Sequence, residues 1–311
     1  MDGQLFVSIC VAAIASGTSI LLPAIGEIVT ERAGILNLGV EGMMLMGALF
    51  GYIVDVDTGN VALALIAAVL AAMALALVHA FLTITVRTNQ IVTGLAATLF
   101  GNGFTAFIGK PFVGAVAPAL LPAVPIPGLS DIPFFGRVLF DHDPVVYGSF
   151  VLTAATAYFI YRTRPGLNLR AIGESPATAD AMGVGVVSRR YGYTLIGGAL
   201  AGLGGAYLSL SYTPTWIDGM TAGRGWIAVG LVVFGVWDPW RAMAGAYLFG
   251  VVDGFQLRLQ GLGSTVSPFF LNMLPYLFTI VVVALSSGEK VQRRLGVPSA
   301  LGLPYWREER T

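Results

Sequence analysis

Long, unbroken apolar runs dominate this chain and limit the folds that are open to it. A helix needs about 20 apolar residues to cross the ~30 Å hydrocarbon core of a bilayer. Nine runs come near this length: 5–26, 34–54, 61–86, 91–109, 145–161, 191–212, 219–237, 242–259 and 269–286. Only 11% of the residues are charged, against about 25% in a soluble protein. Because the runs are continuous rather than alternating, we expect an all-α polytopic membrane protein with about nine spans, between eight and ten.

The basic residues predict how these spans cross the membrane. Lys and Arg resist translocation, so segments rich in them lie on the cytoplasmic side. Five arginines fall between the fifth and sixth runs, in residues 162–190. Placing that segment in the cytoplasm puts the N-terminus outside, the C-terminus inside, and leaves only four basic residues outside: Lys110, Arg137, Arg224 and Arg258. We therefore expect residues 1–311 to form a single transmembrane domain, whose seventh span is the weakest because Arg224 interrupts it.

Residues 110–144 form a long connector that this orientation places outside the cell. The connector contains seven prolines, at positions 111, 118, 122, 125, 127, 133 and 144. Proline removes backbone donors and favours extended or turn geometry, so we do not expect a tenth span here. Two interpretations remain open, a lid without specific chemistry and part of a landing surface for an external partner.

Residues 162–190 are too organised for a simple connector. Within them, Ser175 is a good N-cap, Pro176 suits the first helical turn, and Gly183 favours the left-handed conformation that ends a helix. We therefore predict a short cytoplasmic helix at 174–183, which docks onto a partner in the cytoplasm.

A few polar residues lie deep inside the apolar runs. A charge at the bilayer centre costs about 2.5–3.5 kcal/mol on insertion scales, so we expect Glu41 and Asp253 to face protein or a watery cavity. Two glycine-punctuated segments, 34–42 with Asn37 and 219–226 with Arg224, resemble the broken helices that build transporter sites. Structural pairing within the bundle and lining of a solute path remain open for these residues. Glu27 and Glu31 are expected to be solvated near the inner mouth.

Several kinds of chemistry find no support in the sequence. The pair Gly109-Lys110 is followed by Pro111 and has Phe104 where the first glycine of a phosphate-binding loop would stand, so we expect no ATP hydrolysis by this chain. Two histidines and one cysteine provide no metal-ligand spacing and no disulfide. The formal net charge of +0 gives no reason to expect nucleic-acid binding. We therefore predict no catalytic, cofactor-binding or metal-binding residues.

Five motifs, in a fixed order, resemble the permease subunits of bacterial nucleoside ABC importers, of the branched-chain amino acid/ribose type. The motifs are ERAGILNLGVEGMMLMGA (31–48), RTNQIVTGLA (87–96), PGLNLRAIGESPATADAMGV (165–184), SYTPTWIDGMTAGRGWIAV (211–229) and GAYLFGVVDGFQLRLQ (245–260). The resemblance covers about residues 15–305 and is closest to the shorter member of a permease pair.

The resemblance implies a type II importer fold in the bacterial inner membrane. It also implies a separate ATPase subunit, a second homologous permease that completes a heterodimer, a substrate-binding lipoprotein and a nucleoside substrate. The ATPase-coupling helix of the family corresponds to a stretch that contains Glu174, Ser175, Pro176, Ala179, Ala181 and Gly183. Candidates for the translocation path are Asn37, Glu41, Arg224 and Asp253.

Two alternatives are retained. The same machinery could import a sugar or a branched-chain amino acid. A self-sufficient secondary transporter is a different class, in which Glu41 and Asp253 would couple transport to an ion or proton. The docking segment and the small number of charges along the spans favour the ABC importer.

Overall fold

The computed structural model describes residues 3–261 and 296–307, with isolated positions between 267 and 284. The longer helices are α1 (Gly3–Arg32), α2 (Val40–Thr58), α3 (Val61–Ala80), α4 (Gln90–Gly109), α6 (Pro144–Arg162), α9 (Val186–Tyr207) and α11 (Pro239–Gly261). The shorter ones are α5 (Phe135–Phe140), α7 (Arg164–Glu174), α8 (Pro176–Ala181) and α10 (Arg224–Phe234). Two π-helical turns, η1 (Phe81–Thr85) and η3 (Leu208–Tyr212), follow α3 and α9, and the 3-10 turn η2 (Lys110–Phe112) follows α4. The described part of the chain is thus helical, as expected.

Five helical segments in the described part of the chain are long and apolar enough to cross a membrane: Phe6–Arg32, Val61–Thr85, Gln90–Phe112, Pro144–Arg162 and Val186–Tyr212. Each coincides with one of the apolar runs of the sequence. Continuous apolar sequence therefore predicted five helices that are long and apolar enough to span. The run at 269–286 lies outside the continuous described part.

Two of the remaining three runs form helices that carry charges, and the third forms a helix that is too short to span. The helices α2 and α11 have 19 and 23 residues, enough to span, but α2 carries Glu41, Asp55 and Asp57 and α11 carries Asp253 between two arginines. The prediction of a full span at 219–237 is wrong, because α10 has only 11 residues. The chain before α10 runs as turns up to Gly223, and the helix begins at Arg224 itself.

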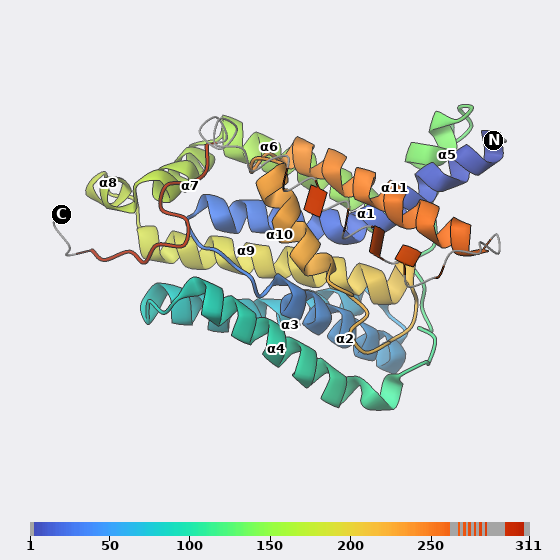
Figure 1. Cartoon of the computed structure of the whole chain (residues 1–311), viewed down its shortest axis with the longest axis horizontal. Coiled ribbons are helices and arrows are strands. Elements are labelled where there is room, and N and C mark those ends of the chain that lie inside the picture. The colour runs from blue at the N-terminus through green and yellow to red at the C-terminus, as the bar shows by residue number, and fades with distance from the viewer. Residues whose placement is uncertain are drawn as a thin grey trace.

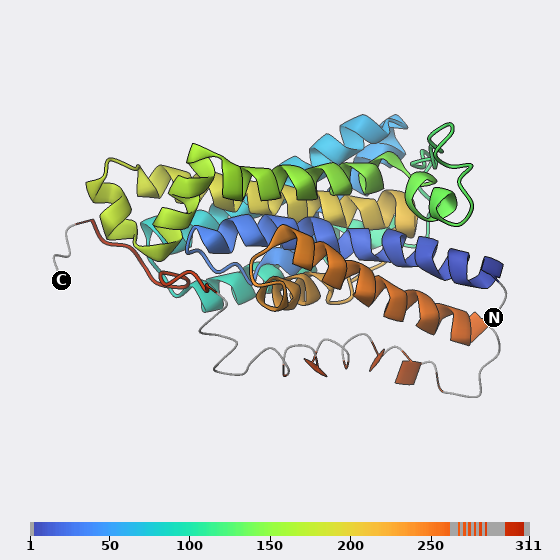
Figure 2. The same ribbon diagram turned by 90° about the horizontal axis from the view of Figure 1, so that it is seen from above.

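The long helix α9 lies at the centre of the bundle, where it packs against α1, α2 and α3 (Figures 1 and 2). Glycine permits this close packing, because it places no side chain between the helix backbones. A Cβ atom on Gly202 would overlap Ala72 of α3, and one on Gly205 would overlap the Met44 carbonyl of α2. Helix backbones therefore meet here with almost no side chain between them.

The connector at 110–144 contains no spanning helix, as its prolines predict. Its longest helix is α5, of six residues. Backbone hydrogen bonds from Gly114 to the Trp216 carbonyl (3.1 Å) and from Ala117 to the Pro214 carbonyl (3.0 Å) join it to the turns before α10. The connector thus covers the entry to α10.

The start of α10 lies against α2, about midway along the long axis of the bundle (Figure 1). A helix start leaves backbone N–H groups without helical partners. Glu41, near the start of α2, supplies the acceptors: Oε1 accepts from the Gly223 N–H (2.8 Å) and from the Thr221 hydroxyl (2.5 Å), and Oε2 accepts from the Gly225 N–H (2.6 Å). The negative carboxylate also suits the positive end of the helix dipole. Glu41 therefore caps α10 from another helix.

We predict that Glu41→Ala destabilises the protein, because it leaves two buried N–H groups without acceptors, at about 1–3 kcal/mol each. Glu41→Gln should lose less, since its amide oxygen can still accept one of these bonds. The measurement is the midpoint of thermal unfolding in detergent. Asp57→Ala is the control, because it removes an exposed acid from the same helix. Equal midpoints for Glu41→Ala and Asp57→Ala would contradict the capping role.

Candidate functional site

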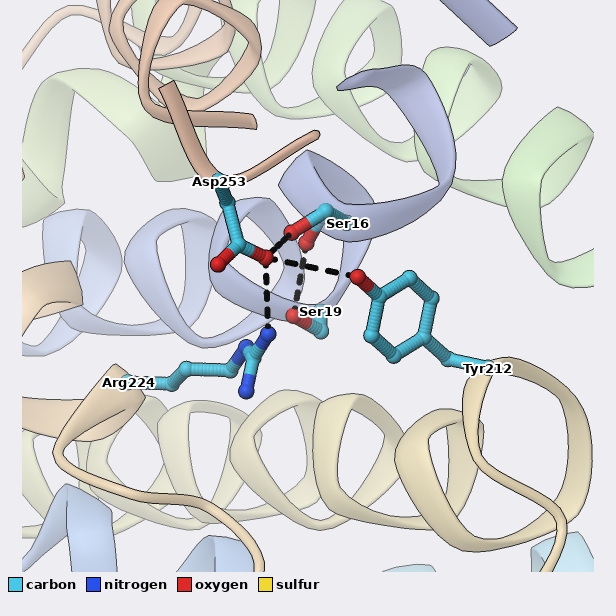
Figure 3. Close-up of polar contacts among 5 residues, drawn as sticks. All are labelled: Ser16, Ser19, Tyr212, Arg224 and Asp253. Atoms are coloured by element: carbon cyan, nitrogen blue, oxygen red, sulfur yellow. Dashed lines mark hydrogen bonds and ion pairs between the residues drawn. The ribbon is translucent and has the colours of Figure 1, made fainter. Parts of the chain in front are cut away.

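The Asp253 carboxylate is the centre of a polar cluster built from four elements (Figure 3). Its Oδ2 atom accepts hydrogen bonds from the Ser16 hydroxyl of α1 (2.5 Å), the Tyr212 hydroxyl of η3 (3.3 Å) and the Arg224 guanidinium of α10 (3.1 Å). Ser19, one turn after Ser16, donates to the Ser16 carbonyl (2.7 Å). The cluster therefore joins α1, η3, α10 and α11 at one point.

The cluster meets the requirement that a buried charge be paired. Asp253 is 9% exposed, and Arg224 and Asp253 form an ion pair with side-chain exposures of 15% and 12%. The Arg224 guanidinium also lies over the Tyr212 ring, 5.4 Å from its centroid, in a cation–π geometry. As the insertion cost predicts, Asp253 has polar partners and is shielded by protein.

Glu41, Arg224 and Asp253 gather around the first turn of α10. Glu41 holds the backbone of that turn, and Asp253 holds the side chain of its first residue, Arg224. Asn37 lies apart from them. Its backbone N–H donates to Glu27 (3.0 Å), and its side-chain oxygen accepts from the Gly39 N–H (3.0 Å). Of the four path candidates, three thus share one region, whereas Asn37 orders the turn between α1 and α2.

The expectation that Glu27 and Glu31 are solvated is wrong. Each is 1% exposed. Glu27 accepts from the Asn37 N–H, and Glu31 accepts from the Trp237 indole N–H (2.5 Å). Their partners come from the α1–α2 turn and from the segment after α10, so sequence proximity to the end of α1 gave no sign of this burial.

The segment at 162–190 contains two helices, α7 and α8, at one end of the bundle (Figure 1). Ser175 is the N-cap of α8, and its hydroxyl accepts from the Thr178 N–H (3.3 Å). Pro176 is in the first turn, and Gly183 follows the helix with a φ of +82°. The local signals for a short capped helix are therefore confirmed, although Glu174 ends α7 and is not part of α8.

The two small residues proposed for docking differ in exposure. Ala179 is 4% exposed and packs into the chain's own core with Leu169 and Val186. Ala181 is exposed, and the adjacent Met182 is 80% exposed. The outward face of α8 therefore runs through Ala177, Ala181 and Met182, and Ala179 instead fixes α8 to the bundle.

Sequence reasoning missed Ser16 and Tyr212. A serine or tyrosine within an apolar run costs little to insert, so neither stands out as an unexpected charge does. Tyr212 does fall in the SYTPTW stretch of one of the five motifs, which was the available signal. The described residues contain no group of three or more His, Cys, Asp or Glu that could hold a metal ion.

Comparison of the sequence with known proteins places the chain in a family. The model for "Branched-chain amino acid transport system / permease component" matches residues 9–285. A protein of Haloferax volcanii, provisionally named glucose ABC transporter permease protein TsgC13, is 42% identical over 96% of this chain and 97% of its own. The guanosine ABC transporter permease protein NupQ of Bacillus subtilis is 32% identical over the whole of both chains.

A third relative is the nucleoside ABC transporter permease protein NupC of Lactococcus lactis, which is 29% identical over 93% of each chain. No solved structure matches the chain. The family model spans most of the sequence, including Glu41, the Asp253 cluster and the α7–α8 segment. The chain therefore belongs to the family of permease components of branched-chain amino acid transport systems, and it is a permease subunit of an ABC transporter.

Proposed function

We propose that this permease carries nucleosides into the cell as part of an ATP-driven importer. The observation that carries the proposal is the end-to-end match to a relative named for guanosine transport, with a second relative named for nucleosides. The order and content of the five sequence motifs support the same assignment. We expect the substrate to meet a weakly binding path, because selectivity would rest with a separate binding protein.

Glucose is the second candidate substrate. The observation in its favour is the 42% identity to a relative provisionally named for glucose. Both candidates are polar, uncharged and rich in hydroxyls, so they make similar demands on a path. Uptake measurements with both solutes therefore distinguish nucleosides from glucose.

The family implies an ATPase and a substrate-binding partner. We further propose that a second, homologous permease completes a heterodimer, that the binding protein is a lipoprotein, and that α7 and α8 face the cytoplasm. In this arrangement the N-terminus lies outside. The exposed face of α8, with Ala181 and Met182, would contact the ATPase, where ATP is hydrolysed.

The geometry around α10 suggests how movement could reach the path. This helix starts within the bundle and is held there by Glu41 of α2 and by Asp253 of α11. A relative shift of α2 and α11 would therefore act directly on its first turn. We propose alternating access in which α8 receives the rigid-body motion of the ATPase and α10 responds to it. Arg224 and Asp253 would line the path, whereas Glu41 and Asn37 order the backbone beside it.

We predict that a strain lacking this gene, and the same strain complemented with it, differ in uptake of labelled guanosine. Glucose and leucine are measured in parallel. Restored uptake of guanosine alone supports the nucleoside assignment, and restored uptake of glucose alone supports the second candidate. If none of the three solutes responds to the gene, the proposed function is contradicted.

We predict that Ala181→Trp abolishes uptake while the protein still folds, because position 181 is exposed and outside the bundle core. The enlarged side chain would no longer fit the ATPase surface. Ala181→Ser, which keeps the residue small, is the control. Co-purification of the ATPase and detergent size exclusion are measured with uptake. Normal uptake and full ATPase retention in Ala181→Trp would show that this face makes no such contact. Ala179→Trp is unsuitable, since Ala179 is buried in the chain's own core.

We predict that Asp253→Leu destabilises the protein by about 3–5 kcal/mol, because it leaves the Arg224 guanidinium buried without a counter-charge. The double variant Asp253→Leu/Arg224→Leu should recover most of that loss. If the pair lines the path, uptake stays low in the stable double variant. Asp57→Leu is the control for loss of an acid. Recovery of both stability and uptake in the double variant would show that the pair is purely structural.

A further inference from the structure

The described tail of the chain, residues 296–307, runs along α7 and α8 at one end of the bundle (Figures 1 and 2). We call this segment the tail strap. It is bound to α7 by the hydrogen bond from the Ala300 N–H to the Gly173 carbonyl (2.8 Å) and by that from the Ser299 hydroxyl to Glu174 (2.7 Å). The strap thus pairs with the last turn of α7, directly before α8.

The strap also reaches α8 itself. Arg307 forms an ion pair with Asp180 of α8, with 3.2 Å between Nε and Oδ2. Tyr305 lies beside the same carboxylate, and partial burial together with a hydrogen bond to Asp180 raises the pKa of its phenol. Asp180 therefore has two partners in the strap.

Two further contacts join the strap to other parts of the bundle. The Gly302 N–H donates to the carbonyl of Gly34 (3.2 Å), in the turn between α1 and α2. The Arg87 guanidinium, between η1 and α4, lies over the Trp306 ring, 4.2 Å from its centroid. Gly34 and Arg87 both have positive φ values, +84° and +64°, so both contacts are made at sharp turns of the backbone. One short segment thus touches α7, α8 and the connections α1–α2 and η1–α4.

The strap has inner contacts with the apolar core, where Leu301 and Tyr305 pack, and outer contacts at the surface. Ala300 is buried, but Trp306 is 43% exposed and the Arg307 side chain is 81% exposed. A cavity of about 320 Å³ lies between the strap and α7, lined by Arg32, Leu167, Arg170, Ala171, Glu174, Gly296 and Pro298. Polar and ring contacts at an exposed site contribute little to folding stability. The outer contacts of the strap are therefore suited to fixing a position rather than to holding the bundle together.

The rest of the structure gives α8 few other attachments. This helix has six residues, and Ala179 is its buried residue. Its main neighbours among the described helices are α7 and α9. The strap links α8 to the Gly34 carbonyl in the α1–α2 turn and to Arg87 before α4.

We propose that the tail strap is a positioning device that ties α8 to the α1–α2 and η1–α4 connections, so that movement of α8 is passed to both. Trp306 and Arg307 are its positioning residues. The inference rests on the proposed function, in which α8 contacts the ATPase. Packed side chains, hydrogen bonds and ion pairs can carry coupling between distant sites, and the strap contacts supply such a connection.

The chain offers a matched control for this idea, because it contains two Trp-Arg dipeptides, 240–241 and 306–307. The first lies exposed on α11, away from the strap contacts. We predict that Trp306→Ala/Arg307→Ala lowers the amount of substrate moved per ATP hydrolysed by ~5-fold or more, the lower end of typical coupling effects. Trp240→Ala/Arg241→Ala should leave this ratio unchanged. The complete complex is reconstituted in vesicles, and ATPase retention is measured beside it.

Exchanging the charges of Arg307 and Asp180 tests whether their ion pair positions α8, as opposed to a general loss of contact between the strap and the bundle. Arg307→Asp alone should lower the ratio, and Arg307→Asp/Asp180→Arg should restore it, because the ion pair is rebuilt with reversed signs. An unchanged ratio in the Trp306→Ala/Arg307→Ala complex would overturn the proposal. Loss of the monodisperse complex in that variant, but not in the 240–241 control, would also overturn it, since the strap would then be a folding element.

Failure of the strap and failure of the proposed function give different results. If the wild-type complex moves none of guanosine, glucose and leucine, the proposed function is contradicted. If the wild-type complex transports one of them and the strap variants do so with the same yield per ATP, the strap alone is contradicted.

Discussion

The start of α10 within the bundle is the constraint around which the other polar features are arranged. Lipid offers no hydrogen bonds, so every backbone N–H at a helix start in the membrane needs a protein acceptor. Glu41 provides acceptors for Gly223 and Gly225, and this fixes the distance between α2 and α10. Once that turn is fixed, Arg224 is held where Asp253, Ser16 and Tyr212 meet. Two acids from two helices therefore position one short helix.

Continuous hydrophobicity was sufficient to predict the helices that cross the bundle, because such a run has no other stable environment. It failed for residues 219–237, where the apolar stretch is real but the helix begins only at Arg224 and ends at Phe234. The cap that starts α10 comes from Glu41, more than 180 positions earlier, and no local pattern reveals it. The burial of Glu31 has the same origin, since its partner is the indole of Trp237.

Some residues of the candidate site could be predicted from the sequence, and others could not. Glu41, Arg224 and Asp253 could be found because a charge in an apolar run is costly and therefore requires an explanation. Their partners Ser16 and Tyr212 are ordinary residues in such runs, so the sequence did not reveal them. In the α7–α8 segment, capping signals located the short helix correctly, but only the packing of the whole chain shows that Ala179 faces inward and Ala181 outward. The side that a helix presents is a property of its neighbours, and a six-residue helix has too little periodicity to encode it.

The glycine contacts of α9 determine which parts of the protein can move independently. At Gly202 and Gly205 the backbone of α9 meets α3 and α2 so closely that even a methyl group would collide. Two surfaces in such contact cannot slide past each other, because each residue would have to cross a neighbouring carbonyl or methyl. The helices α2, α3 and α9 therefore form one closely packed unit, in which these contacts oppose sliding of one helix along another. The short helix α8 differs, because its six residues include no glycine and Ala179 is its buried residue.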